Sequence, residues 1–387
     1  MTSSPIEVAK PNVDGLLADK SVQILICCGS GGVGKTTTSA ALALRAAEVH
    51  HRKVVVLTID PARRLAQSLG LVELDNTPRA VVGVDTSGGG TLDAMMLDMK
   101  RTFDDVVEAH ASPAKAEQIL NNRFYQALST SFSGTQEYMA MEKLGQLHDE
   151  ARTDGRWDLI VVDTPPSRSA LDFLDAPEHL SDLLDGRMLR MLMAPAKGPF
   201  KLMSMGVNLV MSAMTKILGA TVLKDVQTFV AAFETLFGGF RQRAEATLRN
   251  LSSPHTRFVV VATPTRDALR EASFFIDRLR EERMPLRGVA INRVHNSSLD
   301  MSAARATALV EDFGPSAADA ADPHRLERLA LIRHARRMQT VERERDLIEK
   351  FKLTNPRIPM AEVAAQTQDV NDLESLRRVG ALLAEQE

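Results

Sequence analysis

Short apolar runs rich in β-branched residues recur along the chain and alternate with segments of helical periodicity. Runs of this kind are typical of strands that are buried on both faces. Residues 36–47, with alanine and leucine at helical spacing, form the first predicted helix. Strands that alternate with helices indicate an α/β fold, in which a doubly wound, mostly parallel sheet is covered by helices. We predict strands at residues 22–28, 53–59, 92–97, 159–162, 258–262 and 286–291.

Two long segments interrupt the alternation of strands and helices. Residues 100–150 and residues 176–250 both have helical periodicity, and they lie on either side of the fourth predicted strand. We therefore expect them to pack together as a helical subdomain, inserted into a single domain that spans residues 1–387. Residues 316–323 are predicted to form a loose loop, and residues 371–383 a docked terminal helix.

Composition narrows the functional classes. Lysine and arginine number 47 and aspartate and glutamate 50, which gives a net charge of -3, and only 4% of residues are aromatic. This balance does not predict a nucleic-acid partner. The adjacent Cys27 and Cys28 cannot form an ordinary disulfide with each other and provide no CxxC metal pair. The first residues lack the features of a signal peptide, and the apolar stretch 202–215 is too short to span a bilayer, so we expect a cytoplasmic protein.

The segment between the first strand and the first helix carries the strongest chemical signal. Residues 29–36 read Gly-Ser-Gly-Gly-Val-Gly-Lys-Thr and fit the pattern G-x-x-x-x-G-K-[ST]. Glycines allow backbone N–H groups to face phosphates, and the positive end of the following helix favours the same anion. In such a loop Lys35 reaches the terminal phosphates and the Thr36 hydroxyl binds Mg²⁺. A glycine-rich turn with a structural lysine is the alternative.

Two carboxylates follow predicted strands, where ligands of a doubly wound sheet collect. Asp60 comes directly after the second strand, and we predict that it orients the water that attacks the γ-phosphate. Aspartate also suits the N-cap of a helix, which is a structural role at the same position. Asp163 follows four apolar residues of the fourth strand, as in a Walker B segment, and is predicted to hold Mg²⁺. Residues 164–167 would then form the switch segment that senses the γ-phosphate.

These motifs, taken in order, resemble one family. The sequence G-x-G-G-V-G-K-T-T, followed by T-x-D-P-A and then V-V-D-T-x-P, is similar to the arsenite-pump ATPases, which include the ATPase that targets tail-anchored membrane proteins. The resemblance implies a P-loop fold, ATP and Mg²⁺ as ligands, slow ATP hydrolysis without a partner, and a dimer that opens and closes with the nucleotide. The residues expected at the nucleotide are Gly31, Gly32, Val33, Gly34, Lys35, Thr36 and Thr37.

The end of the chain extends the resemblance. Val289-Ala290-Ile291-Asn292 is similar to the strand that ends in the adenine-reading asparagine of the family, and an amide offers adenine both a donor and an acceptor. Asn292 is also a common type of turn residue at a strand end, which is the alternative. The segment 357–360, which includes Pro359, resembles the late loop that lies along the base.

Three departures from the family pattern affect the predicted function. Ser30 stands where the family has a lysine that reaches the partner's nucleotide, so we expect either a homodimer without it or a heterodimer with a related paralogue that keeps it. Pro166 and the two residues after it replace the glycine of the switch segment. The family's arsenite- and zinc-binding cysteines are missing, which disfavours arsenite transport and a zinc-clamped dimer.

Methionines concentrate in the second insertion. Seven of them lie between Met188 and Met214, and residues 187–223 contain no acidic residue. An apolar groove with a cationic rim would suit a hydrophobic protein client, with membrane contact at most transient, whereas methionines that fill a helical core are the alternative. Two other functions remain open. One is a partitioning- or division-type regulatory ATPase, and the other is a weakly hydrolysing ATP-binding scaffold.

Overall fold

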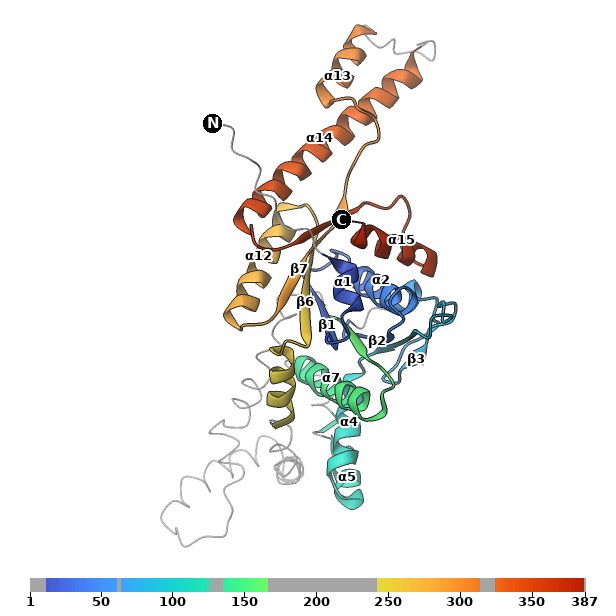
Figure 1. The fold of residues 1–387 in the computed structure, drawn as a ribbon, viewed down its shortest axis with the longest axis vertical. Helices are drawn as coiled ribbons and strands as arrows, with labels where there is room; N and C mark the ends of the chain where they lie inside the picture. Colours follow the sequence, from blue (N-terminus) through green and yellow to red (C-terminus); the bar gives the residue numbers. More distant parts are fainter. Residues whose placement is uncertain are drawn as a thin grey trace, which may run out of the picture.

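One mixed sheet forms the centre of the protein, and helices cover both of its faces (Figure 1). The computed structural model describes residues 12–60, 64–123, 125–126, 135–165, 242–313 and 324–385. Within these residues the sheet has eight strands in the order β3-β4-β2-β5-β1-β6-β7-β8. All neighbouring strands are parallel except β3 and β4. The strands are β1 (Ile24–Cys28), β2 (Lys53–Thr58), β3 (Arg79–Ala80), β4 (Thr91–Met96), β5 (Leu159–Asp163), β6 (Thr256–Ala262), β7 (Leu286–Val294) and β8 (Met360–Ala364).

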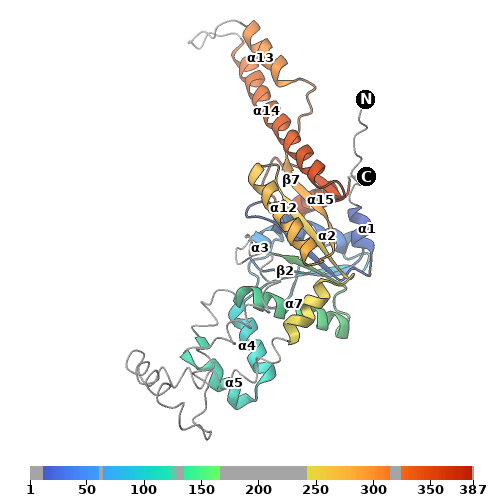
Figure 2. The ribbon, with the colours of Figure 1, turned by 90° about the vertical axis from the view of Figure 1, so that its left-hand side faces the viewer.

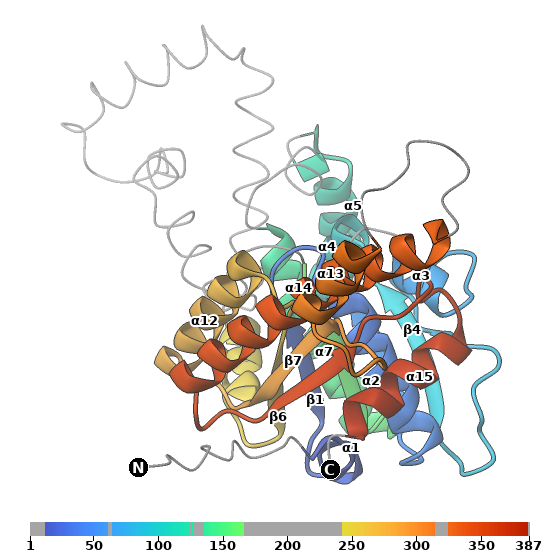
Figure 3. The ribbon, with the colours of Figure 1, turned by 90° about the horizontal axis from the view of Figure 1, so that it is seen from above.

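The helices divide between the two faces of the sheet, which confirms the predicted doubly wound α/β fold. One hydrophobic core joins the sheet to α4, α7, α12 and the end of α14, and the other joins it to α1, α2, α3 and α15. Seen from above, β6 and β7 pass between α12 on one side and α2 and α15 on the other (Figure 3). The helices with given bounds are α1 (Val13–Ala18), α2 (Lys35–Glu48), α3 (Arg64–Ser68), α4 (Met99–His110), α5 (Pro113–Leu120), α7 (Thr135–Asp154), α12 (Arg266–Glu281), α13 (Ala303–Asp312), α14 (Arg325–Thr354) and α15 (Leu373–Ala384).

The first strand illustrates why the sheet needs two cores. All five residues of β1 are buried, and alternate side chains point to opposite faces. Cys28 accordingly lies in the core under α7 and α12, whereas Cys27 lies in the core under α2. Both thiols are free, and burial raises the pKa of Cys27 to about 12, so this thiol stays protonated at neutral pH.

The six predicted strands are all present, and two more strands escaped prediction. β3 has only two residues, both exposed, and it pairs antiparallel with β4 at one edge. β8 forms the opposite edge, beside β7. Its sequence, Met-Ala-Glu-Val-Ala, contains no continuous apolar run because Glu362 interrupts it. Edge strands face solvent on one side, so they do not need the unbroken apolar pattern of the central strands.

The first predicted insertion is helical where the structure describes it, as α4, α5 and α7. Of the second insertion, only residues 242–250 are described, and they are helical as well. Arg243 in that helix forms an ion pair of 2.9 Å with the buried Glu142 of α7, so parts of the two insertions contact each other. The methionine-rich segment 188–214, residues 166–170 and the predicted loop 316–323 lie outside the described residues.

The α13–α14 hairpin projects away from the sheet as an arm (Figures 1 and 2). α14 has 30 residues, and only its C-terminal part packs on the sheet. His295, which directly follows β7, connects to the middle of the helix, because its backbone N–H and its Nδ1 both lie 2.8 Å from carboxylate oxygens of Glu344. Among the described helices, none combines the length and the apolar character that a membrane span requires.

Candidate nucleotide-binding site

The glycine-rich loop lies between β1 and α2, at the carboxyl edge of the sheet, as the sequence predicts. Two of its glycines are required by close backbone packing. Gly29 has a φ of 153°, and a Cβ there would lie 2.2 Å from the carbonyl oxygen of Val261. Gly34 has a φ of 97°, and a Cβ there would lie 2.1 Å from Nδ2 of Asn292. Side chains at either position would push the loop away from the sheet, so its backbone conformation depends on these glycines.

Lys35 begins α2 and is almost fully buried at the base of the loop. Its Nζ donates a hydrogen bond of 2.9 Å to the carbonyl oxygen of Ser30, which keeps the side chain folded over the loop. Burial lowers the pKa of Lys35, while the carboxylates of Asp163 and Asp60 oppose that change. An anionic ligand bound beside Lys35 would therefore offset the free-energy cost of burying its charge.

Asp163 is held at the end of β5 by the strands on either side. In the sheet register it lies beside Thr58 of β2 and Cys27 of β1. Its Oδ2 accepts hydrogen bonds from the hydroxyls of Thr36, at 2.8 Å, and Thr58, at 2.9 Å. The side chain is fully buried, and this burial raises its pKa to about 6, although both hydroxyls and Lys35 favour the charged form.

The arrangement around Asp163 fits a magnesium ion. Its Oδ1 is buried and has no hydrogen-bond partner, and an unsatisfied carboxylate oxygen is costly unless a ligand completes it. The Thr36 hydroxyl supplies a second hard oxygen at the same point. The described residues contain no group of three or more His, Cys, Asp or Glu side chains that could hold a metal by themselves. Magnesium is commonly bound by one or two protein oxygens together with substrate phosphates, and Asp163 and Thr36 would supply the protein oxygens of such a set.

A cavity of about 870 Å³ opens above the glycine-rich loop. Asp60, two residues beyond the end of β2, lies on its wall, while Asp163 lies beneath the floor and contacts Thr36. Gly31 and Val33 belong to the loop but are not among the residues lining this cavity, and the Val33 side chain is buried in the core under α2. Of the predicted residues, those that line the cavity are Gly32, Gly34, Lys35, Thr36, Thr37, Asp60 and Asn292.

Asn292 connects the end of β7 to the loop. Its Nδ2 donates to the carbonyl oxygen of Val33 at 2.9 Å, and its Oδ1 accepts from the backbone N–H of Arg293 at 2.9 Å. Arg293 adopts a φ of 60°, a left-handed conformation that is uncommon for a residue with a side chain. This turn of the backbone fixes the amide of Asn292, which therefore packs against the loop and lines the cavity at once.

The segment after β8 forms another part of the cavity wall. Residues 365, 366 and 368–371 line the cavity, and α15 begins directly after them. The hydroxyl of Ser68, in α3, donates to the carbonyl oxygen of Val370 at 3.4 Å, which links the two sides of the cavity rim. Pro359 directly precedes β8, so it lies at the amino edge of the sheet, whereas the cavity lies at the carboxyl edge. Its carbonyl oxygen accepts a hydrogen bond from the backbone N–H of Val289.

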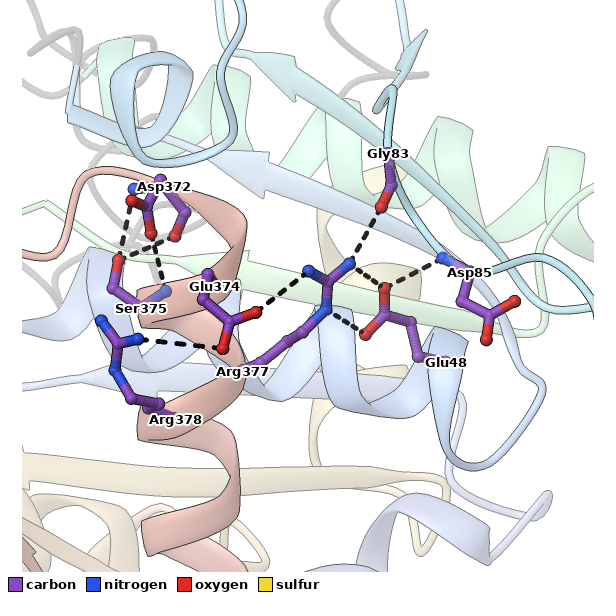
Figure 4. Close-up of polar contacts among 8 residues, drawn as sticks. All are labelled: Glu48, Gly83, Asp85, Asp372, Glu374, Ser375, Arg377 and Arg378. Atoms are coloured by element: carbon purple, nitrogen blue, oxygen red, sulfur yellow. Dashed lines mark hydrogen bonds and ion pairs between the residues drawn. The ribbon is translucent and has the colours of Figure 1, made fainter.

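α15 is docked, as predicted, and its docking holds this wall in place (Figure 4). A capping box between Asp372 and Ser375 starts the helix. Arg377 then donates to both carboxylate oxygens of Glu48, at 2.9 and 2.8 Å, and to the carbonyl oxygen of Gly83 at 2.9 Å. Glu48 is the last residue of α2, the helix that begins at Lys35, so the two ends of the cavity share one support.

Several cavity residues were not predicted from the sequence. Arg64 was missed although it follows Asp60 closely, because the pattern T-x-D-P-A ends before it. Gln67 and Ser68, on the same short helix, were missed for the same reason. Arg293 and His295 follow the predicted Asn292, and no local motif marks them. The segment 365–371 carries no signal in the sequence, since its position depends on where the unpredicted β8 lies.

The chain is similar to a known family and to several of its members. Residues 22–308 match the family described as anion-transporting ATPase. The chain is similar to the ATPase GET3 of Candida glabrata, with 29% identity over 185 residues that cover 46% of this chain and 51% of the relative. For the ATPase GET3 of Zygosaccharomyces rouxii, identity is 27% over 241 residues, 58% of this chain and 67% of the relative. For that of Ajellomyces dermatitidis, it is 25% over 291 residues, 74% and 77%.

The family match covers more of this chain than the match to the Candida glabrata relative does. The chain spans about half the length of the Candida glabrata relative. The family match, in contrast, covers most of this chain and includes the glycine-rich loop, Asp60, Asp163 and Asn292. The chain belongs to the anion-transporting ATPase family.

Proposed function

We propose that this protein is a magnesium-dependent ATPase that works as a nucleotide-driven switch. The observation that carries this proposal is the Thr36–Asp163 pair. Its buried, unpartnered Oδ1 lies next to Lys35, beneath a cavity that is large enough for a nucleotide. The family membership and the similarity to proteins named ATPase GET3 support the same conclusion.

The residues of the site have distinct roles in the proposed reaction. Backbone N–H groups of the loop bind the phosphates, and Lys35 binds the terminal phosphate oxygens. Thr36 and Asp163 hold Mg²⁺, which would neutralise charge on the phosphates when bound. Asp60 positions a water molecule for in-line attack on the γ-phosphate, and ADP and phosphate are the products. Lys35, Thr36 and Asp163 already have hydrogen bonds that fix them before the ligand arrives, which limits the reorganisation that catalysis requires.

Asn292 is the proposed contact to adenine. In the ligand-free chain its amide uses one N–H and one lone pair within the protein, which leaves a second N–H and a second lone pair for a base. The wall formed by residues 365–371 lies across the cavity, and it takes the position along the base that the resemblance assigned to Pro359. Pro359 itself supports that wall only indirectly, through the start of β8.

The switch is proposed to act in a dimer that closes around ATP and opens after hydrolysis. A hydrophobic protein segment is the proposed client, held by the helical subdomain of residues 100–150 and 176–250. The similarity to the ATPase GET3 proteins favours this function over a partitioning- or division-type regulatory ATPase. The length of the two insertions supports the same choice.

Ser30 supports a second candidate function. A neutral residue at this position gives the site no cation to place on a partner's nucleotide, and losing such a contact costs about 10²- to 10³-fold in rate. The chain would then be a weakly hydrolysing, ATP-binding member of a heterodimer with a paralogue that carries the lysine. Copurification from the native host, with identification of partner chains and bound nucleotide, distinguishes a homodimer from a heterodimer with such a paralogue.

Hydrolysis by the purified full chain tests the proposed function. We expect phosphate release from ATP with Mg²⁺, none in excess EDTA, and none from Asp60→Asn with Mg²⁺. Binding of ATP by Asp60→Asn at wild-type affinity would show that this variant is folded. A wild-type chain that binds no adenine nucleotide, or hydrolyses it equally well in EDTA, would contradict the proposal.

A further inference from the structure

The charges around the cavity are unevenly distributed. An ATP–Mg²⁺ complex keeps a net negative charge, and the loop itself offers one cation, Lys35. Ser30, at the other end of the loop, is neutral. Enzymes that transfer phosphoryl groups generally place a further cation at the terminal phosphate, since charge is spread over its oxygens in the transition state. A second positive group from this chain would have to come from the cavity wall.

Arg64, at the first position of α3, is such a group. It lines the same cavity as Lys35, Thr36 and Asp60, and it lies four residues after Asp60 in the chain. Burial is the main cause that lowers the pKa of Lys35, and repulsion from Arg64 adds to it. The two cations therefore face the same space and repel each other in the ligand-free protein. A bound phosphate group between them would relieve that repulsion.

The Arg64 side chain is available for a ligand. It is exposed, and within the part of the chain that the structure describes its guanidinium makes no hydrogen bond or ion pair. Other arginines near the cavity serve the fold instead, as Arg377 does through Glu48. Arg293 also lines the cavity, beside Asn292, but unlike Arg64 it is not among the main charges that shift the pKa of Lys35.

We propose that Arg64 contacts the terminal phosphate of ATP and provides, from the same chain, the second cation of the site. This inference rests on the proposed function and adds a catalytic residue to it. A guanidinium binds two phosphate oxygens at once and is always charged, so it suits this position better than a flexible ammonium group.

Two substitutions in the full chain test this proposal. For Arg64→Ala we expect ATP affinity, measured by calorimetry with Mg²⁺, to fall at least tenfold, and ADP affinity less than threefold, because only ATP has the terminal phosphate. Turnover should fall about 10²-fold. Arg64→Lys should recover part of both losses. Arg270→Ala, which removes an arginine that is 73% exposed on α12, is the matched control and should change neither.

The outcomes separate this inference from the proposed function. If the wild-type chain binds no ATP, the proposed function fails and this inference fails with it. If the wild type binds ATP but Arg64→Ala keeps the wild-type ratio of ATP to ADP affinity within threefold, only the role of Arg64 is overturned. A ratio that falls more than threefold, with an unchanged melting temperature, supports it. Arg293→Ala should leave the ratio unchanged, and a loss of the ratio there instead would assign the contact to Arg293.

Discussion

The two ends of the cavity are built in different ways. The phosphate end, where we propose that the triphosphate binds, comes from one contiguous loop, residues 29–37, and from two carboxylates at the ends of neighbouring strands. The base end, the proposed adenine site, combines Asn292, residues 365–371 and Val379, which meet because β7 and β8 are neighbours and α15 folds back onto α2. A local motif therefore specifies the first end, whereas the topology of the whole domain specifies the second.

The electrostatic character of the two ends differs as well. Lys35 and Asp163 are buried. Burial lowers the pKa of Lys35 and raises the pKa of Asp163, so it favours the neutral form of both side chains. Residues 368, 369 and 371, at the base end, are exposed. In the proposed complex the phosphates would meet desolvated charges, whereas the base would meet a more exposed wall of amides, backbone and the carboxylate of Asp369. Variants at the phosphate end should have the larger effects.

Removal of the buried cation should have the largest effect. Lys35→Ala is expected to lower turnover about 10²- to 10³-fold, because it removes the buried cation that the loop itself supplies to the terminal phosphate. ATP binding should weaken in parallel, which calorimetry measures. The folded chain should tolerate the change, since the substitution removes a desolvated charge. A variant that hydrolyses ATP at the wild-type rate would show that the loop does not hold the phosphates.

Asp163 should make the stability of the ligand-free protein depend on pH. The pKa of Asp163 in the folded protein, about 6, exceeds its ordinary value of 3.8. Between pH 3.8 and pH 6 the folded state therefore keeps a proton that the unfolded state has lost. Stability from this group is therefore present below pH 3.8 and is lost as the pH rises through 6. At about 1.4 kcal/mol for each pH unit, the loss amounts to about 3 kcal/mol.

Denaturant unfolding in EDTA, from pH 4 to 7, measures this loss. The difference between the wild type and Asp163→Asn isolates the contribution of Asp163, because the other carboxylates titrate in both proteins. We expect the stability of the wild type to fall relative to that of the variant over this range. Parallel curves would mean that Asp163 is charged in the folded, metal-free protein.

Asn292 should have an intermediate effect. Asn292→Ala removes one hydrogen bond to the loop and the proposed contact to adenine, so ATP affinity should fall about 5- to 10-fold while GTP affinity changes little. Competition binding with both nucleotides measures the ratio. Equal losses for ATP and GTP would limit Asn292 to support of the loop, through its bond to Val33.

The smallest effect is expected at the support of the base end. Arg377→Ala removes the bonds to Glu48 and Gly83, and because the arginine is partly exposed we expect a loss of only about 1 kcal/mol in unfolding free energy. Arg378→Ala, on the exposed side of the same helix, is the control and should change stability by less than about 0.5 kcal/mol. If both variants are equally stable, Glu48 does not hold α15.

What the sequence predicts and what it misses follow the same division. The loop, Asp60 and Asp163 are found from residues that are adjacent in the chain or directly follow apolar strands. Arg64 and residues 365–371 are missed, since their positions result from the path of the chain after the motifs end. Pro359 was predicted to lie along the base, and the structure places it at the amino end of β8, one strand length away from the cavity. The methionine-rich segment 188–214 stays a prediction.

Phosphate recognition by the loop is the property on which every other proposed role depends. Calorimetric titration of the full chain with AMP, ADP and ATP, in the presence of Mg²⁺, tests it most directly. If the loop and Lys35 bind the phosphates, affinity should rise about tenfold or more from AMP to ADP, and again from ADP to ATP. Equal affinity for the three nucleotides, or no binding of any, would contradict the account.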